Sequence, residues 1–139
     1  EALLKDIESH VKEIVHFIPM IEKYEKERIE NTKKRLYEAL QQNDIAIDEN
    51  RFEQELIYYL EKYDINEEKV RLKNHCGYLL ETIHSESQAV GKKINFIAQE
   101  IGREINTIGS KANHSEIQKI VVNMKDLLEK IKEQSLNVL

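Results

Sequence analysis

The stretch GKKINFIAQEIGREINTIGSKAN, residues 91–113, decides the fold. Its apolar residues recur every three or four positions, the spacing of an amphipathic helix with one buried face: Ile94, Ile97, Ala98, Ile101, Ile105, Ile108 and Ala112. At about 100° per residue, polar residues fall in one row along the edge of that face: Glu100, Glu104, Thr107 and Lys111, with Arg103 beside it. Two carboxylates, a hydroxyl and cations in one row make this helix the first place to look for chemistry.

The composition predicts an all-α fold. The 139 residues are enough for one domain with a real core, and they include only four Gly and one Pro. Hydrophobic residues make up 40% and charged residues 34%. So few helix breakers favour about five helices, with long antiparallel helices packed in a bundle.

Charge and cysteine content narrow the class of partner. The net charge of −5 means that a polyanion would need a local basic patch or bound cations. The single cysteine, Cys76, excludes an internal disulfide and a multi-cysteine zinc site, and it fits a cytoplasmic location. No apolar run has the length of a membrane span, so no membrane partner is expected.

The N-terminal third predicts one long helix, from about residue 1 to 42. Its first half carries an apolar seam of Leu4, Ile7, Val11, Ile14, Ile18 and Ile21. Pro19 is expected to kink or interrupt this helix. Residues 22–35 are mostly charged, which indicates a solvated arm or a contact with another subunit. We therefore expect residues 1–50 to form a connector or oligomerisation arm, and residues 51–139 to form a C-terminal helical domain.

Three more helices complete the expected fold besides the one at residues 91–113. Asp48 is expected to cap a helix that buries Phe52, Leu56, Tyr59, Leu60 and Tyr63. A break near residues 64–67 leads to a third helix, about 66–87, that buries Leu72, Cys76, Leu79, Leu80 and Ile83. The last helix starts at Ser115 and carries a seam of Ile117, Ile120, Val121, Met124, Leu127, Leu128 and Ile131.

Two polar rows are candidates for chemistry. Glu100 and Glu104 could both reach one hard cation such as Mg²⁺ or Mn²⁺, or they could simply pair with Arg103 and Lys111 on a solvated face. A second row places Glu68, Arg71 and His75 on the third helix, suited to proton transfer and phosphate binding, or to a polar network between helices. Both alternatives stay open for each row.

Other residues suit nucleic acid with less specificity. Lys92 and Lys93 oppose the dipole of their helix, which phosphate contact would explain as well as plain solvation does. Tyr58 and Tyr59 could stack on bases, although tyrosines at helical spacing are usually core residues.

The run at residues 91–113, with IVVNMKDLLEKIKEQSLNVL at 120–139, resembles the C-terminal domain of the YicC/YloC family of bacterial proteins. NRFEQELIYYLEKYDINEEKVRLKNH, residues 50–75, is similar to the middle section of that family. The resemblance is dense from residue 51 to 139 and general before it. The polar residues that match the motifs of this family are Glu55, Asp64, Glu67, Glu68, Arg71, His75, Gln99, Glu100, Arg103, Glu104, Asn106, Thr107, Ser110 and Lys111.

This resemblance implies a metal-dependent endoribonuclease that acts on single-stranded RNA, with a role in small-RNA turnover. It also implies a homo-oligomer, a hexameric ring, with subunit contacts through the long N-terminal helix. An N-terminal domain precedes this region in the family, so the chain is expected to be a fragment that works with that domain.

We assign roles within this resemblance as a hypothesis. A divalent cation, Mn²⁺ or Mg²⁺, would be held by Glu67, Glu68, Glu100 and Glu104. Catalysis would use His75 as general acid or base together with Glu68, Glu100 and Glu104. RNA phosphates would contact Arg71, Arg103, Lys111 and Lys92. The alternatives are a helical oligomerisation or scaffold module without catalysis, and an RNA-binding protein that needs no metal.

Overall fold

The computed structural model describes residues 2–43, 46, 48–85 and 89–138. Within them the chain forms five α-helices: α1 (Ala2–Asn43), α2 (Glu49–Lys62), α3 (Asn66–Ile83), α4 (Val90–Lys111) and α5 (Ser115–Ser135). No strand occurs in these described residues. The expected all-α fold of about five helices is confirmed.

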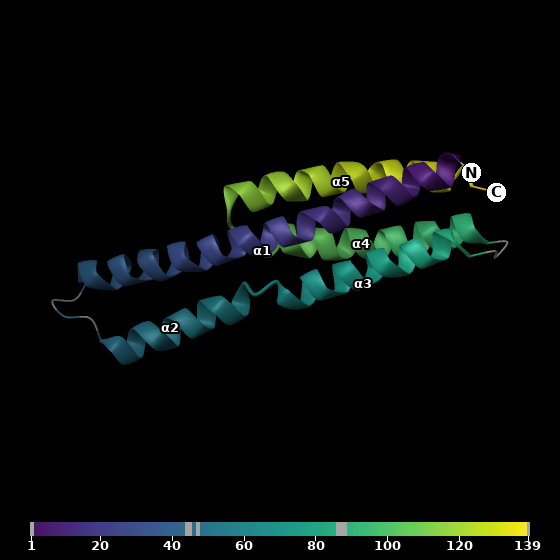
Figure 1. The fold of residues 1–139 in the computed structure, drawn as a ribbon. Helices are drawn as coiled ribbons and strands as arrows, with labels where there is room; N and C mark the ends of the chain where they lie inside the picture. The colour runs from purple at the N-terminus through teal and green to yellow at the C-terminus, as the bar shows by residue number, and fades with distance from the viewer. Residues whose placement is uncertain (1, 44–45, 47, 86–88, 139) are drawn as a thin grey trace.

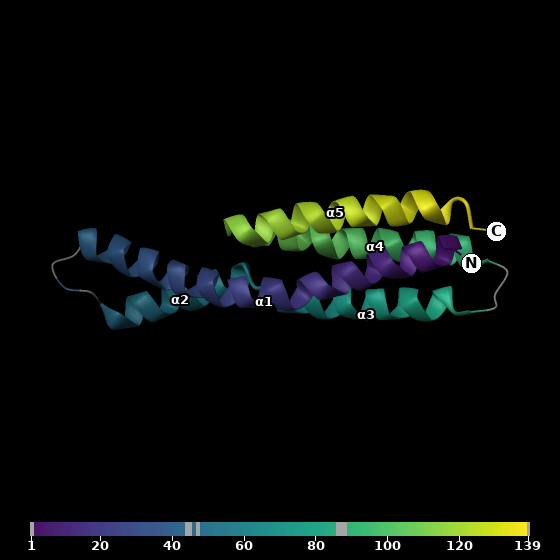
Figure 2. The same cartoon turned by 45° about the horizontal axis from the view of Figure 1, so that its top comes forward.

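The helices form a bundle with an arm that projects from it (Figures 1 and 2). The first half of α1 packs against α3 and α5, and α4 packs against the same two helices; α3 and α4 run antiparallel. The second half of α1 and α2 form a hairpin that extends past the ends of α4 and α5 (Figure 1). α1 and α5 lie side by side, and His10 Nδ1 is 3.1 Å from Gln134 Oε1 across 124 residues of sequence.

The core is built largely from the seams that the sequence predicted. Every apolar residue of the opening stretch named above is buried, as is the seam of α5 and the seam of α1 from Ile7 to Ile21. Leu4 is only partly buried. Full burial of such a side chain is worth about 1.5–3 kcal/mol, so one continuous apolar core holds the four bundle helices together.

Pro19 does not interrupt α1. The helix is continuous from Ala2 to Asn43 with Pro19 inside it, so the expected interruption is wrong. Ile18 and Ile21 on either side stay buried in the core, while Pro19 faces solvent. Packing thus maintains the helix across the missing backbone donor.

The charged segment at residues 22–35 is also more buried than expected. Glu25 and Arg28 are only 9% and 8% exposed, so describing the whole segment as a solvated arm is wrong. These two side chains lie where α1 crosses the end of α2 and the end of α4, and that crossing covers them.

α2 departs most from expectation. None of its residues is buried, and Tyr59 of the expected buried stripe is 40% exposed. The reason is that, among the described residues, α2 packs chiefly against α1, and most of it lies past the ends of α4 and α5. The predicted cap is confirmed, because Asp48 Oδ1 accepts the backbone N–H groups of Asn50 at 3.1 Å and Arg51 at 3.4 Å.

The remaining boundaries agree with the sequence to within a few residues. A break separates α2 from α3 as predicted, and α5 begins at Ser115. α3 ends at Ile83, and Leu80 is only partly buried, contrary to expectation. Glu1, Glu86 and Ser87 of the expected helices lie outside the described residues.

Two expectations about organisation stay predictions: the division at residue 50, and subunit contacts through α1. Among the described residues, no helix is both long and apolar enough to cross a membrane.

Candidate active site

The two polar rows predicted from the sequence meet across the seam between α3 and α4. Lys111 Nζ, at the end of α4, donates to Glu68 Oε2 at 3.1 Å and to the backbone oxygen of Asp64 at 3.3 Å. Glu68 is 6% exposed, and its Oε1 atom has no hydrogen-bond partner. This contact joins the α2–α3 corner to α4 and fixes the register of the two antiparallel helices.

That register brings His75 of α3 and Glu104 of α4 to the same position along the axis of the bundle. Each lies two turns, about 10 Å, along its helix from the Glu68–Lys111 contact, which in antiparallel helices places them opposite each other. Glu104 is 9% exposed and makes no hydrogen bond or ion pair with any described residue. The Nδ1 atom of His75 is buried and has no hydrogen-bond partner among the residues that the structure describes. Two titratable groups without partners therefore share one level of the seam.

The outer members of the rows are engaged in surface ion pairs. Arg103 Nε lies 3.2 Å from Glu100 Oε2, and Arg71 pairs with Glu67. Both cations are more than half exposed. Exposed pairs of this kind contribute little to stability, so these arginines remain available to an anionic ligand.

Lys92 stands apart from the other predicted phosphate contacts. It is exposed in the first turn of α4, whereas Lys111 is in the last, so the two lie about 28 Å apart along the axis. Lys92 cannot contact the same phosphate as Lys111 within one chain.

The four predicted metal ligands do not gather into one cage. No group of three or more His, Cys, Asp or Glu side chains in the described ranges could hold a metal ion. Glu67 is exposed and turned to Arg71, while Glu68 is held by Lys111. Glu100 and Glu104 remain as two carboxylates one turn apart. Mg²⁺ is often held by only one or two carboxylates, with water and substrate phosphate completing its shell.

The other carried-over residues lie on the helix surfaces in local contacts. Glu55 pairs with Arg51 at 3.3 Å, and the remaining polar members bond within α4 or face solvent: Gln99, Asn106, Thr107 and Ser110. Cys76 takes no part in chemistry here, because its complete burial raises the pKa of the thiol to about 12.

Sequence reasoning missed a buried arginine next to these rows. Arg28 donates from Nη1 to the backbone oxygen of Lys111 at 3.0 Å, and from Nη2 to the backbone oxygen of Tyr63 at 2.7 Å. The same Nη2 lies 2.5 Å from Glu25 Oε1. Arg28 therefore ties α1 to the last carbonyls of α2 and α4. The spacing of Glu25 and Arg28 resembles that of the exposed Glu30–Lys33 pair, so no sequence signal separated them.

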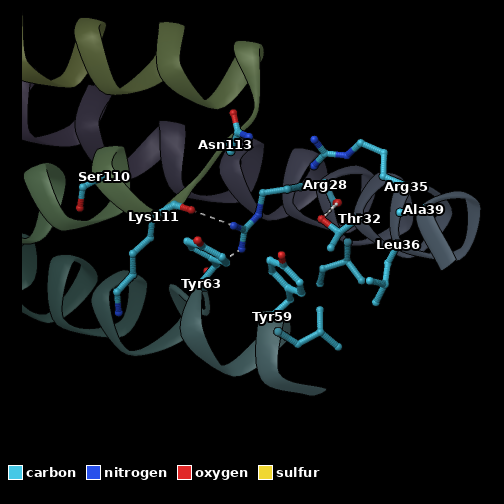
Figure 3. Close-up of a pocket in the computed structure, with 12 residues that line it drawn as sticks. Arg28, Thr32, Arg35, Leu36, Ala39, Tyr59, Tyr63, Ser110, Lys111 and Asn113 are labelled. Atoms are coloured by element: carbon cyan, nitrogen blue, oxygen red, sulfur yellow. Dashed lines mark hydrogen bonds between the residues drawn. The ribbon is translucent and has the colours of Figure 1, made fainter. Parts of the chain in front are cut away.

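A groove of about 400 Å³ opens beside Arg28, between the second half of α1, the end of α2 and the end of α4 (Figure 3). Among the described residues, its lining includes Arg28, Arg35 and Lys111 but no carboxylate, together with the rings of Tyr59 and Tyr63. Figure 3 shows the Lys111 side chain extending away from Arg28, in the direction of α3. Lys111 thus belongs to both places: its backbone borders the groove and its ammonium group enters the α3–α4 seam.

Comparison with known proteins identifies the class. A family model described as "Endoribonuclease YicC-like, C-terminal" matches residues 20–139. The chain is 40% identical to a probable endoribonuclease YicC of Clostridioides difficile over 98% of its own length, and 35% identical to one of Haemophilus influenzae over 76%.

The chain therefore belongs to the YicC-like endoribonuclease family, in the part that the family model calls C-terminal. This confirms the resemblance seen in the sequence. The matched regions cover 47% and 37% of those two relatives, so the chain spans about half of their length or less.

Proposed function

We propose that this chain forms the helical part of an endoribonuclease that hydrolyses phosphodiester bonds in single-stranded RNA, with its reaction centre at the level of Glu104 and His75. The observation that carries the proposal is Glu104, a glutamate only 9% exposed as a whole residue, whose carboxylate makes no hydrogen bond or ion pair with any described residue. Burying an unpaired carboxylate is costly, and a bound cation or donor would offset that cost.

The residues present suit a divalent cation shared with substrate. Glu100 and Glu104 would supply two carboxylate oxygens, and water and an RNA phosphate would supply the rest. When bound, Mn²⁺ or Mg²⁺ lowers the pKa of a coordinated water and stabilises negative charge on a phosphate. Glu67 and Glu68, also predicted as ligands, are held by Arg71 and Lys111, so we assign them supporting roles.

The chain's own side chains would bind the phosphate and move protons. In hydrolysis a water oxygen bonds to phosphorus, the bond to the leaving oxygen breaks, and one proton passes from the water to the leaving group. The unpartnered ring nitrogen of His75 suits one of these transfers. Arg103 and Arg71 would contact the flanking phosphates, because their guanidinium groups are exposed.

One observation favours a scaffold role for part of the rows. The Glu68–Lys111 pair links the α2–α3 corner to α4, as a structural network would. Small-RNA turnover, a hexameric ring, the family's N-terminal domain as partner and a cytoplasmic location extend the proposal, and each stays a prediction.

The test compares Glu104→Gln with the unmodified sequence, in this chain and in the complete gene product. We expect loss of Mn²⁺-dependent cleavage of single-stranded RNA, and loss of any rise in melting temperature on adding Mn²⁺. The matched control is Glu116→Gln, which alters a half-buried glutamate on α5 away from the seam. Cleavage and Mn²⁺ response that both survive Glu104→Gln would move the reaction centre elsewhere.

A further inference from the structure

The cationic groove beside Arg28 lies outside the residues assigned to catalysis above. We propose that it binds one nucleotide unit of single-stranded RNA, with the phosphate on Arg35 and the base on the ring of Tyr59. The inference rests on the proposed function, since it supplies a binding site for the substrate of that reaction.

The charge of the groove sets it apart from the rest of the molecule. The chain carries 26 acidic against 21 basic residues, yet three basic residues and no acidic one border the groove in the described part of the chain, although the Lys111 ammonium group points away from it. A polyanion repelled by the overall charge would therefore find a local positive surface here. A local basic patch is one of the two features, with bound cations, that a polyanion would need on a chain of this net charge.

Only one of the three cations is free for a ligand. Arg28 is engaged by Glu25 and two backbone oxygens, and Lys111 by Glu68. Arg35 is exposed, and within the described part of the chain it makes no ion pair. In Figure 3 its side chain reaches back along α1 toward the α4 end of the groove. Its planar guanidinium group suits bidentate binding of a phosphate.

The aromatic wall supplies the base-binding surface. Tyr59 is 40% exposed, and its ring lies 19° from parallel to that of Tyr63, with 6.0 Å between centroids. Tyr58, 60% exposed, meets Tyr59 edge to face, and Lys62 Nζ lies 5.7 Å from the centre of the Tyr58 ring. Exposed tyrosines next to cations form the stacking platforms that bind unpaired bases without strong sequence preference.

The geometry favours single strands over duplex RNA. Stacking requires access to the face of a base, and a duplex hides its base faces within the helical stack. The carboxamide of Asn113 is exposed at the rim and makes no hydrogen bond with the described residues, so it can bond to a base edge. The last turn of α4, which borders the groove, also carries the ammonium group that enters the α3–α4 seam.

The test is binding of a fluorescently labelled single-stranded RNA oligomer, measured by anisotropy with a chelator present so that no metal-dependent cleavage occurs. We expect Tyr59→Leu to weaken binding about ten- to hundredfold, and Tyr59→Phe to bind like the unmodified chain, since the ring is what stacks. Arg35→Gln should weaken binding, and it should lower the slope of log affinity against log salt by about 0.7, the value of one phosphate contact.

The controls carry the same changes outside the groove. Lys34→Gln removes one exposed cation on the neighbouring position of α1, and Tyr78→Leu removes an exposed tyrosine of α3. Both should change affinity less than about threefold. Helix content by circular dichroism checks that every variant is folded.

Any one of several results would overturn the inference. Lys34→Gln could weaken binding as much as Arg35→Gln, or duplex RNA could bind as tightly as single strands. Alternatively, free mononucleotide could displace the oligomer at equal concentration, which would make the groove a nucleotide site and not an RNA site. Binding that depends on Tyr59 while Glu104→Gln still cleaves would refute the proposed reaction centre and keep the groove. Loss of cleavage in Glu104→Gln, with no effect of Tyr59→Leu on binding, would refute the groove and keep the proposed reaction centre.

Discussion

Replacing Arg28 by methionine tests how much the buried hydrogen bonds of this side chain stabilise the fold. Arg28 is 8% exposed and holds Glu25 and the backbone oxygens of Tyr63 and Lys111. Arg28→Met keeps much of the aliphatic stem but removes all of these donors at once. The Glu25 side chain, 12% exposed, is then left as a carboxylate without its cation, with little access to water.

The expected loss of unfolding free energy is about 3–5 kcal/mol, the range for removing one partner of a buried ion pair. The two backbone carbonyls add to this cost only in part, because water can enter from the adjacent groove. The double change Glu25→Met/Arg28→Met removes both charges together, so it should recover most of the loss.

Urea unfolding followed by helical circular dichroism measures these differences. The matched control is Arg71→Met, which breaks an exposed pair with Glu67 and should cost less than about 1 kcal/mol. If Arg28→Met cost no more than Arg71→Met, then Arg28 would not be the tie between α1, α2 and α4, and the reasoning would be refuted.

Three further predictions concern Gly91, Gly77 and Cys76. Gly91→Ala should lower the unfolding free energy by about 1–3 kcal/mol, because the added Cβ would lie 2.9 Å from the backbone oxygens of Ser135 and Val138. At Gly77 an added Cβ meets open space, so Gly77→Ala should raise the unfolding free energy by about 0.5–1 kcal/mol. Urea unfolding measures both changes, and the same change in unfolding free energy for the two variants would contradict this reasoning. Burial raises the pKa of the Cys76 thiol to about 12, whereas the thiol of an unfolded chain has a pKa of about 8.5. Between these two pH values the folded state keeps the proton and the unfolded state loses it, so the unfolding free energy falls as pH rises from about 8.5 to about 12. Cys76→Ala should reduce this fall, and a thiol reagent should label the native chain only after unfolding; rapid labelling without urea would contradict the assigned burial.

The sequence was sufficient for the bundle because its signals are local. The isoleucines of α4 repeat at the helical period, and the Asp48 cap bonds to backbone groups only two and three residues away. Such patterns need no knowledge of which helix packs against which. They indicate where a helix begins, and which face is apolar.

The same kind of pattern was misleading for α2. Its apolar stripe at Phe52, Leu56, Leu60 and Tyr63 has a good helical period, yet none of it is buried. Periodicity shows that a helix has an apolar face, but burial depends on how many neighbours cover that face. In the described part of the chain α1 is the main neighbour of α2, because the hairpin extends past the ends of the other helices.

The candidate site was predicted as residues but not as an arrangement. The rows on α3 and α4 were identified separately, and their meeting at Lys111 and Glu68 joins positions 43 residues apart. The groove depends on Arg35 of α1 and on Tyr59 and Tyr63 at the end of α2. In the sequence, the spacing of these residues does not differ from that of ordinary solvated or core residues. Only the crossing of α1 over the ends of α2 and α4 gives these residues a common surface.

The packing of α1 against α5 has a consequence for synthesis on the ribosome. The contact of His10 with Gln134 spans 124 residues, so the bundle cannot close until α5 has been made. At about 5–20 residues per second, roughly 5–20 seconds pass between completion of α1 and completion of α5. Throughout that interval the isoleucine seam of α1 lacks one wall of its core and keeps apolar surface exposed, so closure of the bundle is a late step of folding.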